Sequence, residues 1–207
     1  MAYNCSLAES TIKCVERKMH TEYNWFDNPE LGETPASFLE LIEKVLIPLN
    51  PEGVSNAERE PESGEYGAVK FTFNGQRCLF RQAKTTPTKV GQFVTIWKRE
   101  TEDSEIAPFN THDGIELVFI ASFDPSNKGF FVFQNELLGK KNVFTHNGRE
   151  GKRAIRVYAP WIKTTVKQAI STQKWQTSAF INLNLDAELT LSKAKQLIRK
   201  SGNLSLF

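Results

Sequence analysis

The sequence predicts an α+β domain in which helices flank a mixed β-sheet. Three observations support this prediction: segments with helical spacing and helix-start residues, several short alternating or apolar runs typical of strands, and an ordinary globular composition. Apolar residues make up 40% of the 207 residues and charged residues 24%, which is close to the usage of globular domains. A chain of this length suits one domain, so residues 1–207 are expected to form a single unit.

Nothing in the chain indicates a membrane or secreted protein. No run of about 18 apolar residues occurs, and the first residues lack the basic stretch and apolar stretch of a signal peptide. The odd set of Cys5, Cys14 and Cys78 has no metal-ligand spacing, and the histidines lie far from it. We therefore expect reduced thiols, a cytoplasmic location, no membrane association and no zinc site.

Residues 34–48 predict the first helix. Thr34 is a suitable N-cap, Pro35 suits the first turn and Pro48 stops the helix. Apolar side chains fall on one face and are expected to pack on the core: Phe38, Leu41, Ile42, Val45 and Leu46. Residues 50–64 are acidic, contain Pro and Gly and show no period, so they are predicted to form an exposed loop.

A β-hairpin is the clearest local prediction. Residues 69–73 alternate apolar with polar, and Asn74-Gly75 is a strong two-residue turn. This turn sets residues opposite one another in three pairs: Phe73 with Gln76, Phe71 with Cys78, and Val69 with Phe80. Cys78 is therefore expected in the core.

The same register predicts what lies at the end of the second hairpin strand. The two-residue period places Gln82 and Lys84 on the face of Phe80, and Arg77, Leu79 and Arg81 on the other face. An apolar face that ends in Gln and Lys suggests a cleft at the end of this strand.

Residues 86–97 allow two interpretations. Thr86-Pro87 resembles a cap and first turn, and four apolar residues keep helical spacing: Val90, Phe93, Val94 and Trp97. Gly91 and the β-branched and aromatic residues around it favour a strand instead. The helix is the preferred interpretation, and the strand is the alternative.

The second half of the chain predicts strands interleaved with helices. The strands are expected at 116–122, 129–133 and 153–158, with a short helix at 135–141 and a last helix near 191–200. A further helix is expected from Thr165 to about Phe180, because Thr165 and Gln168 form a capping box. This element order is typical of a mixed sheet flanked by helices.

Charge is segregated along the chain, although the net charge is only +2. Seven bases and no acid lie between Lys70 and Arg99, and six acids and no base between Glu100 and Glu116. Seven further bases and one acid lie between residues 149 and 176. A charged cleft facing a polyanion requires such segregation.

From Gly64 to Phe180 the sequence is similar to the MepB family. Several co-linear motifs carry the resemblance: GEYGA (64–68), the run from Phe80 to Arg99, PF followed by Asp113 and Glu116, GFFVF (129–133), GKRAIRVY (151–158), PW (160–161), and QA with TQKWQ (168–176). The resemblance implies a bacterial protein with a restriction-endonuclease-like core and nucleic-acid binding, often encoded beside a multidrug efflux pump. Residues 1–33 and 185–207 match less well and are treated as appendages of the 64–180 core.

The resemblance also raises a hypothesis of catalysis. Nucleases of the restriction-endonuclease class hold a metal with carboxylates and use a Lys to position or activate water. The corresponding residues here are Glu65, Gln82 and Lys84, with Asp113 and Glu116 as substitute carboxylates because Gln82 is uncharged. Mg²⁺ is expected only if the chain is an active nuclease. In the alternative, Gln82 and Lys84 merely end a strand, and the two acids cap or solvate the next.

Nucleic-acid binding is the broader hypothesis, because Lys and Arg neutralise phosphates and exposed Trp stacks on unpaired bases. The expected binding residues are Arg81, Lys84, Lys89, Lys98, Arg99, Lys152, Arg153, Arg156, Lys167, Lys174 and Trp175. On the helix beginning near Thr165, Lys167, Ser171 and Lys174 form one stripe and Gln168, Thr172 and Trp175 a neighbouring one.

Two alternatives to nucleic-acid binding remain open from the sequence. One is a pocket for a small anionic molecule lined by Arg81, Lys84 and Arg156, which the neighbourhood of efflux genes makes reasonable. The other is a structural or protein-partner role. The deciding question is whether the two basic segments and the Gln82/Lys84 strand end meet in one groove. The sequence does not determine the oligomeric state.

Overall fold

The computed structural model describes residues 34–60, 64–99, 101 and 103–199. Along the chain the elements are α2 (Ala36–Leu41), the π-helix η2 (Ile42–Leu46), α3 (Ile47–Leu49), β1 (Val54–Arg59), the 3-10 helix η3 (Gly64–Tyr66), β2 (Val69–Phe73), β3 (Gln76–Gln82), β4 (Lys84–Thr86), β5 (Lys89–Thr95), β6 (Trp97–Lys98), β7 (Ala107–Pro108), β8 (Leu117–Phe123), β9 (Lys128–Gln134), α4 (Asn135–Lys140), β10 (Ala154–Val157), α5 (Lys167–Thr177), β11 (Phe180–Asn182) and α6 (Ala187–Ile198).

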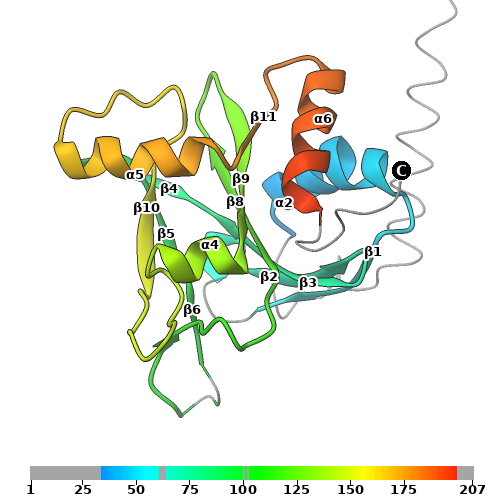
Figure 1. Ribbon diagram of the computed structural model, residues 1–207. Helices are drawn as coiled ribbons and strands as arrows, with labels where there is room; N and C mark the ends of the chain where they lie inside the picture. The colour runs from blue at the N-terminus through cyan, green and yellow to red at the C-terminus, as the bar shows by residue number, and fades with distance from the viewer. Residues whose placement is uncertain (1–33, 61–63, 100, 102, 200–207) are drawn as a thin grey trace, which may run out of the picture.

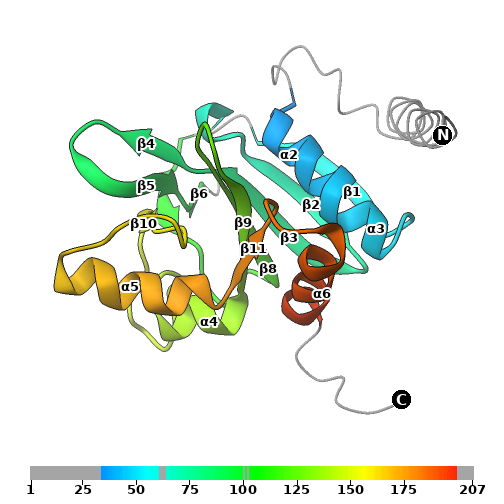
Figure 2. The same cartoon turned by 90° about the horizontal axis from the view of Figure 1, so that it is seen from above.

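These elements confirm an α+β fold with a mixed sheet. The large sheet has the strand order β1-β2-β3-β8-β9-β11, in which β3 and β8 run parallel and the other neighbours antiparallel. Helices α2 and α6 lie on one side of this sheet, and α4, α5 and the small sheet β10-β5-β4 lie on the other (Figures 1 and 2). None of the described helices has the length and apolar character needed to cross a membrane.

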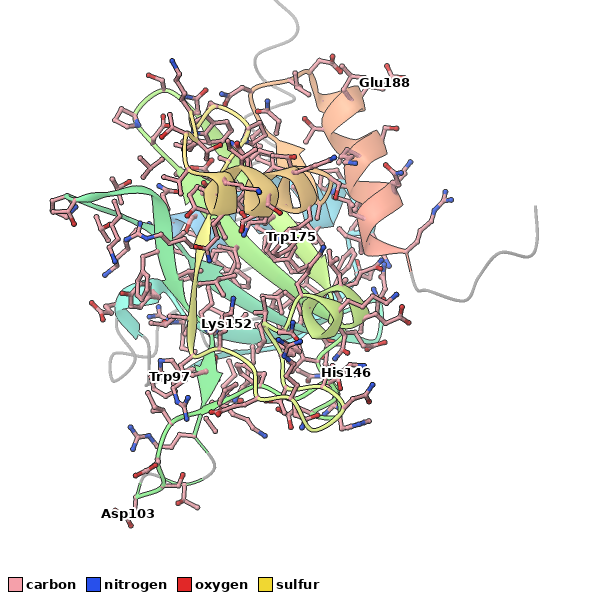
Figure 3. The ribbon with its side chains drawn as sticks, turned by 60° about the vertical axis from the view of Figure 1, so that its left-hand side comes forward. Trp97, Asp103, His146, Lys152, Trp175 and Glu188 are labelled. Atoms are coloured by element: carbon pink, nitrogen blue, oxygen red, sulfur yellow. The ribbon has the colours of Figure 1, made fainter. Side chains whose placement is uncertain are left out.

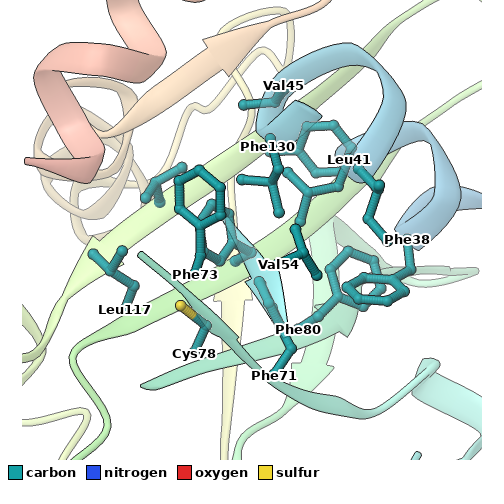
Figure 4. Close-up of a cluster of buried hydrophobic side chains, with 14 of the residues drawn as sticks. Phe38, Leu41, Val45, Val54, Phe71, Phe73, Cys78, Phe80, Leu117 and Phe130 are labelled. Atoms are coloured by element: carbon teal, nitrogen blue, oxygen red, sulfur yellow. The ribbon is translucent and has the colours of Figure 1, made fainter. Parts of the chain in front are cut away.

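Both faces of the large sheet are buried, each against its own apolar cluster. The first cluster packs α2, η2 and α6 on Phe71, Cys78 and Phe80 (Figure 4). The second packs the small sheet and α4 on Leu79 and on alternate residues of β8 and β9. A sheet covered on both faces reads in sequence as near-continuous apolar strands, as β8 and β9 do.

The hairpin of β2 and β3 has the predicted register. Phe73 pairs with Gln76, Phe71 with Cys78 and Val69 with Phe80. The strand ends earlier than predicted, however, because β3 stops at Gln82 and Lys84 begins β4 of the small sheet. The prediction of one continuous strand to Lys84 is therefore wrong, because the chain changes sheets after Gln82. Gln82 and Lys84 still both lie beside residues 65–67.

The first helix is confirmed over the predicted range, and its predicted apolar face is buried. The position of its cap differs, because Pro35 is the N-cap and makes no side-chain hydrogen bond. The loop predicted at 50–64 is wrong, since Val54–Arg59 form β1 along the edge of the sheet. A bulge between Ser55 and Glu58, with Asn56 at φ +50°, breaks the alternation by which a strand is recognised.

The preferred helix at 86–97 is also wrong, and the strand alternative is confirmed. Residues 84–95 form the β4–β5 hairpin, and β5 also pairs with β10. Gly91 has φ +80°, a conformation that no helix uses and that glycine adopts readily. The tertiary pairing with β10 thus decides a segment in which local spacing was ambiguous.

The strands near 116–122, 129–133 and 153–158 and the short helix at 135–141 are confirmed to within two residues at either end. The capping box expected at Thr165 is wrong: α5 begins at Lys167, and its N-cap Val166 has no side-chain hydrogen bond. The last helix begins earlier than predicted because Asp186 caps it, accepting a 2.9 Å hydrogen bond from the Leu189 N–H. The three-residue strand β11 was not predicted.

The burial of Cys78 leads to a chemical prediction. Cys78 is 1% exposed, and burial raises the pKa of its thiol to about 12. In a Cys5→Ser/Cys14→Ser variant, we expect iodoacetamide at pH 8 to modify the folded protein roughly a thousandfold more slowly than the urea-unfolded chain, because the thiolate is the nucleophile. Mass spectrometry of quenched time points measures both rates, and equal rates would contradict the burial.

The raised pKa of Cys78 also links stability to pH. An unfolded thiol ionises near pH 8.5, whereas the folded one ionises at about 12. The contribution of this group to stability is therefore fully present below about pH 8.5 and is lost as the pH rises towards 12. A Cys78→Ala variant should lack this part of the alkaline decline.

Candidate functional site

A groove lies where α5 passes beside β10 and the β4–β5 turn. It encloses about 650 Å³. Its lining comes from the β4–β5 turn, from the segment after α4, from β10 and from α5: Thr88, Lys89, Val90, Lys141, Val143, Lys152, Ala154, Ile155, Arg156, Tyr158, Val166, Gln168, Ala169, Thr172, Trp175 and Gln176. Figure 3 looks towards this region, with Trp175 beneath α5 and Lys152 below it. We call it the basic groove.

The basic groove carries positive charge without compensation from its own lining. Lys89, Lys141, Lys152 and Arg156 all line it, and the lining contains no Asp or Glu. Within the part of the chain that the structure describes, no ion pair joins Lys89, Lys141 or Lys152 to a carboxylate. A concave surface with one sign of charge concentrates anions.

Arg156 holds the β4–β5 turn against β10. Its guanidinium donates hydrogen bonds to the carbonyls of Lys89 (3.3 Å) and Gly91 (3.0 Å) and to the hydroxyl of Thr86 (2.7 Å). Arg suits this role because its donors form a rigid fork. Arg156 therefore positions the turn that carries Lys89, besides adding charge to the groove.

Gly91 allows the turn to approach Tyr158. A Cβ atom at Gly91 would lie 2.6 Å from the Tyr158 ring and 2.9 Å from the carbonyl oxygen of Val157. With its φ of +80°, this position requires glycine for both space and backbone conformation.

Two glutamines attach α5 to the chain around β10. The fully buried Gln176 accepts a hydrogen bond from the Tyr158 N–H and donates one to the Arg156 carbonyl, both 2.9 Å. Gln173 donates to the carbonyls of Ala159 (2.9 Å) and Ile162 (2.7 Å). Because most of α5 faces solvent, side-chain amides rather than a broad apolar face set its position.

Trp175 is the aromatic residue that α5 directs into the groove. Its ring packs on Phe133 at 5.2 Å between centroids, and the Lys141 ammonium lies 5.7 Å from the centre of the same ring. The side chain is half-buried, so Trp175 is both part of the second apolar cluster and part of the groove surface.

The structure brings together some of the predicted binding residues. Lys89, Lys152, Arg156 and Trp175 come from the two basic segments of the sequence and meet in the groove. The predicted stripe of Gln168, Thr172 and Trp175 also faces it. Lys167 and Lys174 lie on the same helix, exposed but outside the groove lining.

The other predicted bases have partners elsewhere. Arg81 was expected to bind nucleic acid, but its side chain is 1% exposed and pairs with Glu60 at 2.6 Å, so it is removed from the set of phosphate contacts. Lys84 pairs with Glu65 (3.2 Å), Lys98 with Asp113 (2.7 Å) and Arg153 with Glu150 (2.9 Å). Arg99 donates to the Ser104 carbonyl. None of these side chains lines the groove.

Sequence reasoning missed several residues of the groove. Lys141 follows α4, outside both basic segments, and only the fold brings it to Trp175. Val90, Tyr158 and Val166 also line the groove. No local signal distinguishes these residues from ordinary strand or loop positions.

The residues proposed for a nuclease do not assemble into a metal site. Glu65 pairs with Lys84, whereas the Gln82 side chain accepts a hydrogen bond from Ser37 (2.8 Å). Glu116 lies beside Arg77, at the opposite end of β3 from Gln82, which is roughly 16 Å away at the usual rise of a strand.

Asp113 is also engaged elsewhere. It accepts hydrogen bonds from the Lys98 ammonium (2.7 Å) and the Asn110 N–H (2.8 Å). Within the described residues, no three His, Cys, Asp or Glu side chains could hold a metal together. The candidate residues Glu65, Gln82, Asp113 and Glu116 are therefore not brought together as one Mg²⁺ site.

Comparison with known proteins gives consistent matches. The family described as MepB-like matches residues 60–182. A solved structure described as "Crystal Structure of MepB" is 34% identical, with a TM-score of 0.62, over 68% of this chain and 95% of that chain. No curated protein matches.

Proposed function

This chain belongs to the MepB-like family, and on that premise we propose that it binds nucleic acid through the basic groove. The observation that carries the proposal is the convergence of Lys89, Lys141, Lys152 and Arg156 on one concave surface whose lining contains no acid. These bases come from three separate parts of the chain. Their approach is therefore a property of the fold rather than of a local run of lysines.

Phosphate contacts would supply most of the affinity. Each neutralised phosphate releases condensed counterions, so log K falls with log salt concentration by about 0.7–0.9 per contact. Three groove lysines that pair with no carboxylate among the described residues therefore predict a slope of about −2 to −3. Gln168 and Thr172, which line the same groove, add donors and acceptors for phosphate oxygens or base edges.

The proposal includes a restriction-endonuclease-like core used for binding rather than cleavage. Supporting it are the mixed sheet, the family membership and the Glu65–Lys84 pair beside the end of β3. Active Mg²⁺-dependent cleavage is not part of the proposal, because the candidate carboxylates are far apart or already engaged.

A small anionic molecule is the second candidate ligand. The observation that favours it is the size of the groove, because about 650 Å³ lies within the usual range of small-molecule pockets. In that case, a small anion that binds the groove would raise the melting temperature of the protein. Oligonucleotides would not bind and would leave the melting temperature unchanged.

Removal of two groove lysines tests the proposal. We expect Lys89→Gln/Lys152→Gln to weaken oligonucleotide binding about tenfold or more at low salt, and to reduce the salt slope by about 2, because each lost phosphate contact removes about 1. Fluorescence anisotropy of labelled DNA and RNA at 50–200 mM salt measures both quantities.

The matched control is Lys44→Gln/Lys195→Gln. It removes the same charge from two exposed positions on η2 and α6, on the other side of the large sheet (Figure 2). An equal loss in both double variants would mean that net charge, not the groove, determines binding. Absent or salt-insensitive binding by the wild-type protein would refute the proposed function.

A further inference from the structure

We infer that the basic groove takes an unpaired nucleobase together with its flanking phosphates, so that single-stranded nucleic acid is the preferred ligand. This inference rests on the proposed function and specifies its substrate class. Phosphate binding by the lysines does not involve the aromatic and apolar side chains of the groove lining. These are Trp175, Tyr158, Val90 and Val166.

The apolar part of the lining is unusually open to solvent. Val90 is 55% and Val166 66% exposed, and they belong to different elements, since Val90 lies in β5 and Val166 is the N-cap of α5. A duplex keeps its bases stacked inside and presents mainly phosphates and groove edges, which make little use of such side chains. An unstacked base exposes its apolar faces, which can pack against such side chains.

Trp175 offers the ring on which a base would stack. Phe133 packs against this ring, and the Lys141 ammonium lies 5.7 Å from its centre. Stacking of a base on tryptophan is generally stronger than a solvent-exposed cation–π contact. A base can therefore take the place of Lys141 on the ring, and the displaced ammonium can pair with the adjoining phosphate.

The size and polar lining of the groove agree with this ligand. A volume of about 650 Å³ suits a drug-sized molecule, which corresponds to one or two nucleotides rather than a double helix. Lys89, in β5, and Lys152, just before β10, line the same groove as Trp175. A short strand can therefore contact lysines while one of its bases reaches the ring.

Three ligands separate stacking from charge. A 12-residue oligothymidine and a 12-residue abasic strand have the same number of phosphates, and a 12-base-pair duplex has about twice as many. We expect oligothymidine to bind about tenfold more tightly than the abasic strand, with the duplex no tighter than the abasic strand. Equal affinities for oligothymidine and the abasic strand would overturn the inference and leave phosphate binding intact. Absence of binding to all three would refute the proposed function itself.

Variants of Trp175 test whether its ring is the surface on which the base stacks. Trp175→Leu should abolish the preference for oligothymidine over the abasic strand, and Trp175→Phe should retain part of it. Trp161→Leu is the matched control, because Trp161 packs on Phe180 at 5.3 Å and does not line the groove. Thermal unfolding of each variant checks its folding. An unchanged preference in a folded Trp175→Leu protein would contradict the assignment of this ring.

A mononucleotide distinguishes a strand from a free small molecule. We expect thymidine monophosphate to compete with labelled oligothymidine only at a concentration at least about a hundredfold higher than unlabelled 12-residue strand, because it supplies one of several phosphate contacts. Competition at equal concentrations would overturn the strand assignment in favour of a free nucleotide.

Discussion

Replacement of Glu60 by alanine is expected to lower the free energy of unfolding by about 3–5 kcal/mol. Arg81 is 1% exposed, and its guanidinium pairs with the Glu60 carboxylate at 2.6 Å and donates to the Phe80 carbonyl at 2.8 Å. Burial lowers the pKa of Arg81, and the charge of Glu60 opposes that shift. Because arginine stays protonated in proteins, the variant leaves a buried charge without its partner.

Lys70 provides the control for this prediction. It pairs with the same carboxylate at 2.8 Å, but its side chain is 48% exposed. Lys70→Ala should therefore change stability by less than about 1 kcal/mol. Urea unfolding followed by circular dichroism measures both values, and comparable effects of the two variants would show that Arg81 is not dependent on Glu60.

A double variant tests the cause of the loss. Replacing both partners with apolar residues, as in Glu60→Leu/Arg81→Met, removes the buried charge together with its counter-charge. Such replacements are often neutral or stabilising, so we expect the double variant to be more stable than Glu60→Ala. A double variant less stable than Glu60→Ala would indicate that packing, not the unpaired charge, dominates.

Gly91→Ala is expected to have the second largest effect, a loss of about 2–5 kcal/mol. The positive φ of +80° costs an L-residue about 1–2 kcal/mol. The added Cβ would overlap the Tyr158 ring at 2.6 Å, and overpacking of this kind costs about 1–3 kcal/mol. Urea unfolding of the variant measures the combined loss.

Gly75→Ala separates the two contributions. Gly75 has a similar φ of +74°, but no atom lies within 4 Å of its Cβ position, so only the backbone strain applies. Since Gly91 follows Lys89 and Val90 directly in β5, Gly91→Ala should weaken oligonucleotide binding, whereas Gly75→Ala should not. Equal stability losses in the two variants would show that Tyr158 gives way without penalty.

The Glu60→Ala and Gly91→Ala predictions concern different parts of the fold. The Glu60–Arg81 pair lies within the well-packed sheet, where a charge needs a partner. Gly91 lies in the small sheet, which together with α5 forms the groove through the hydrogen bonds of Arg156, Gln173 and Gln176. The groove therefore depends on a few polar contacts, and single substitutions there are expected to change binding.

Local sequence patterns were sufficient to predict the elements whose structure depends on residues nearby in the chain. The Asn74-Gly75 turn determined the register of β2 and β3, and apolar spacing identified the first helix and the burial of Cys78. The same logic failed where a bulge or a positive φ interrupts the period, as at Asn56 and Gly91. At those positions, pairing with a distant strand outweighs local preference.

The tertiary structure alone decided which charges are available. In the sequence Arg81, Lys84, Lys89 and Lys152 are equivalent bases, whereas in the fold Arg81 is buried with Glu60 and Lys84 pairs with Glu65. Lys89 and Lys152 meet Lys141 and Trp175 across the basic groove. The reason is physical: backbone periodicity acts over a few residues, but a charge pairs with whatever carboxylate the folded chain brings within a few ångströms, however distant in sequence.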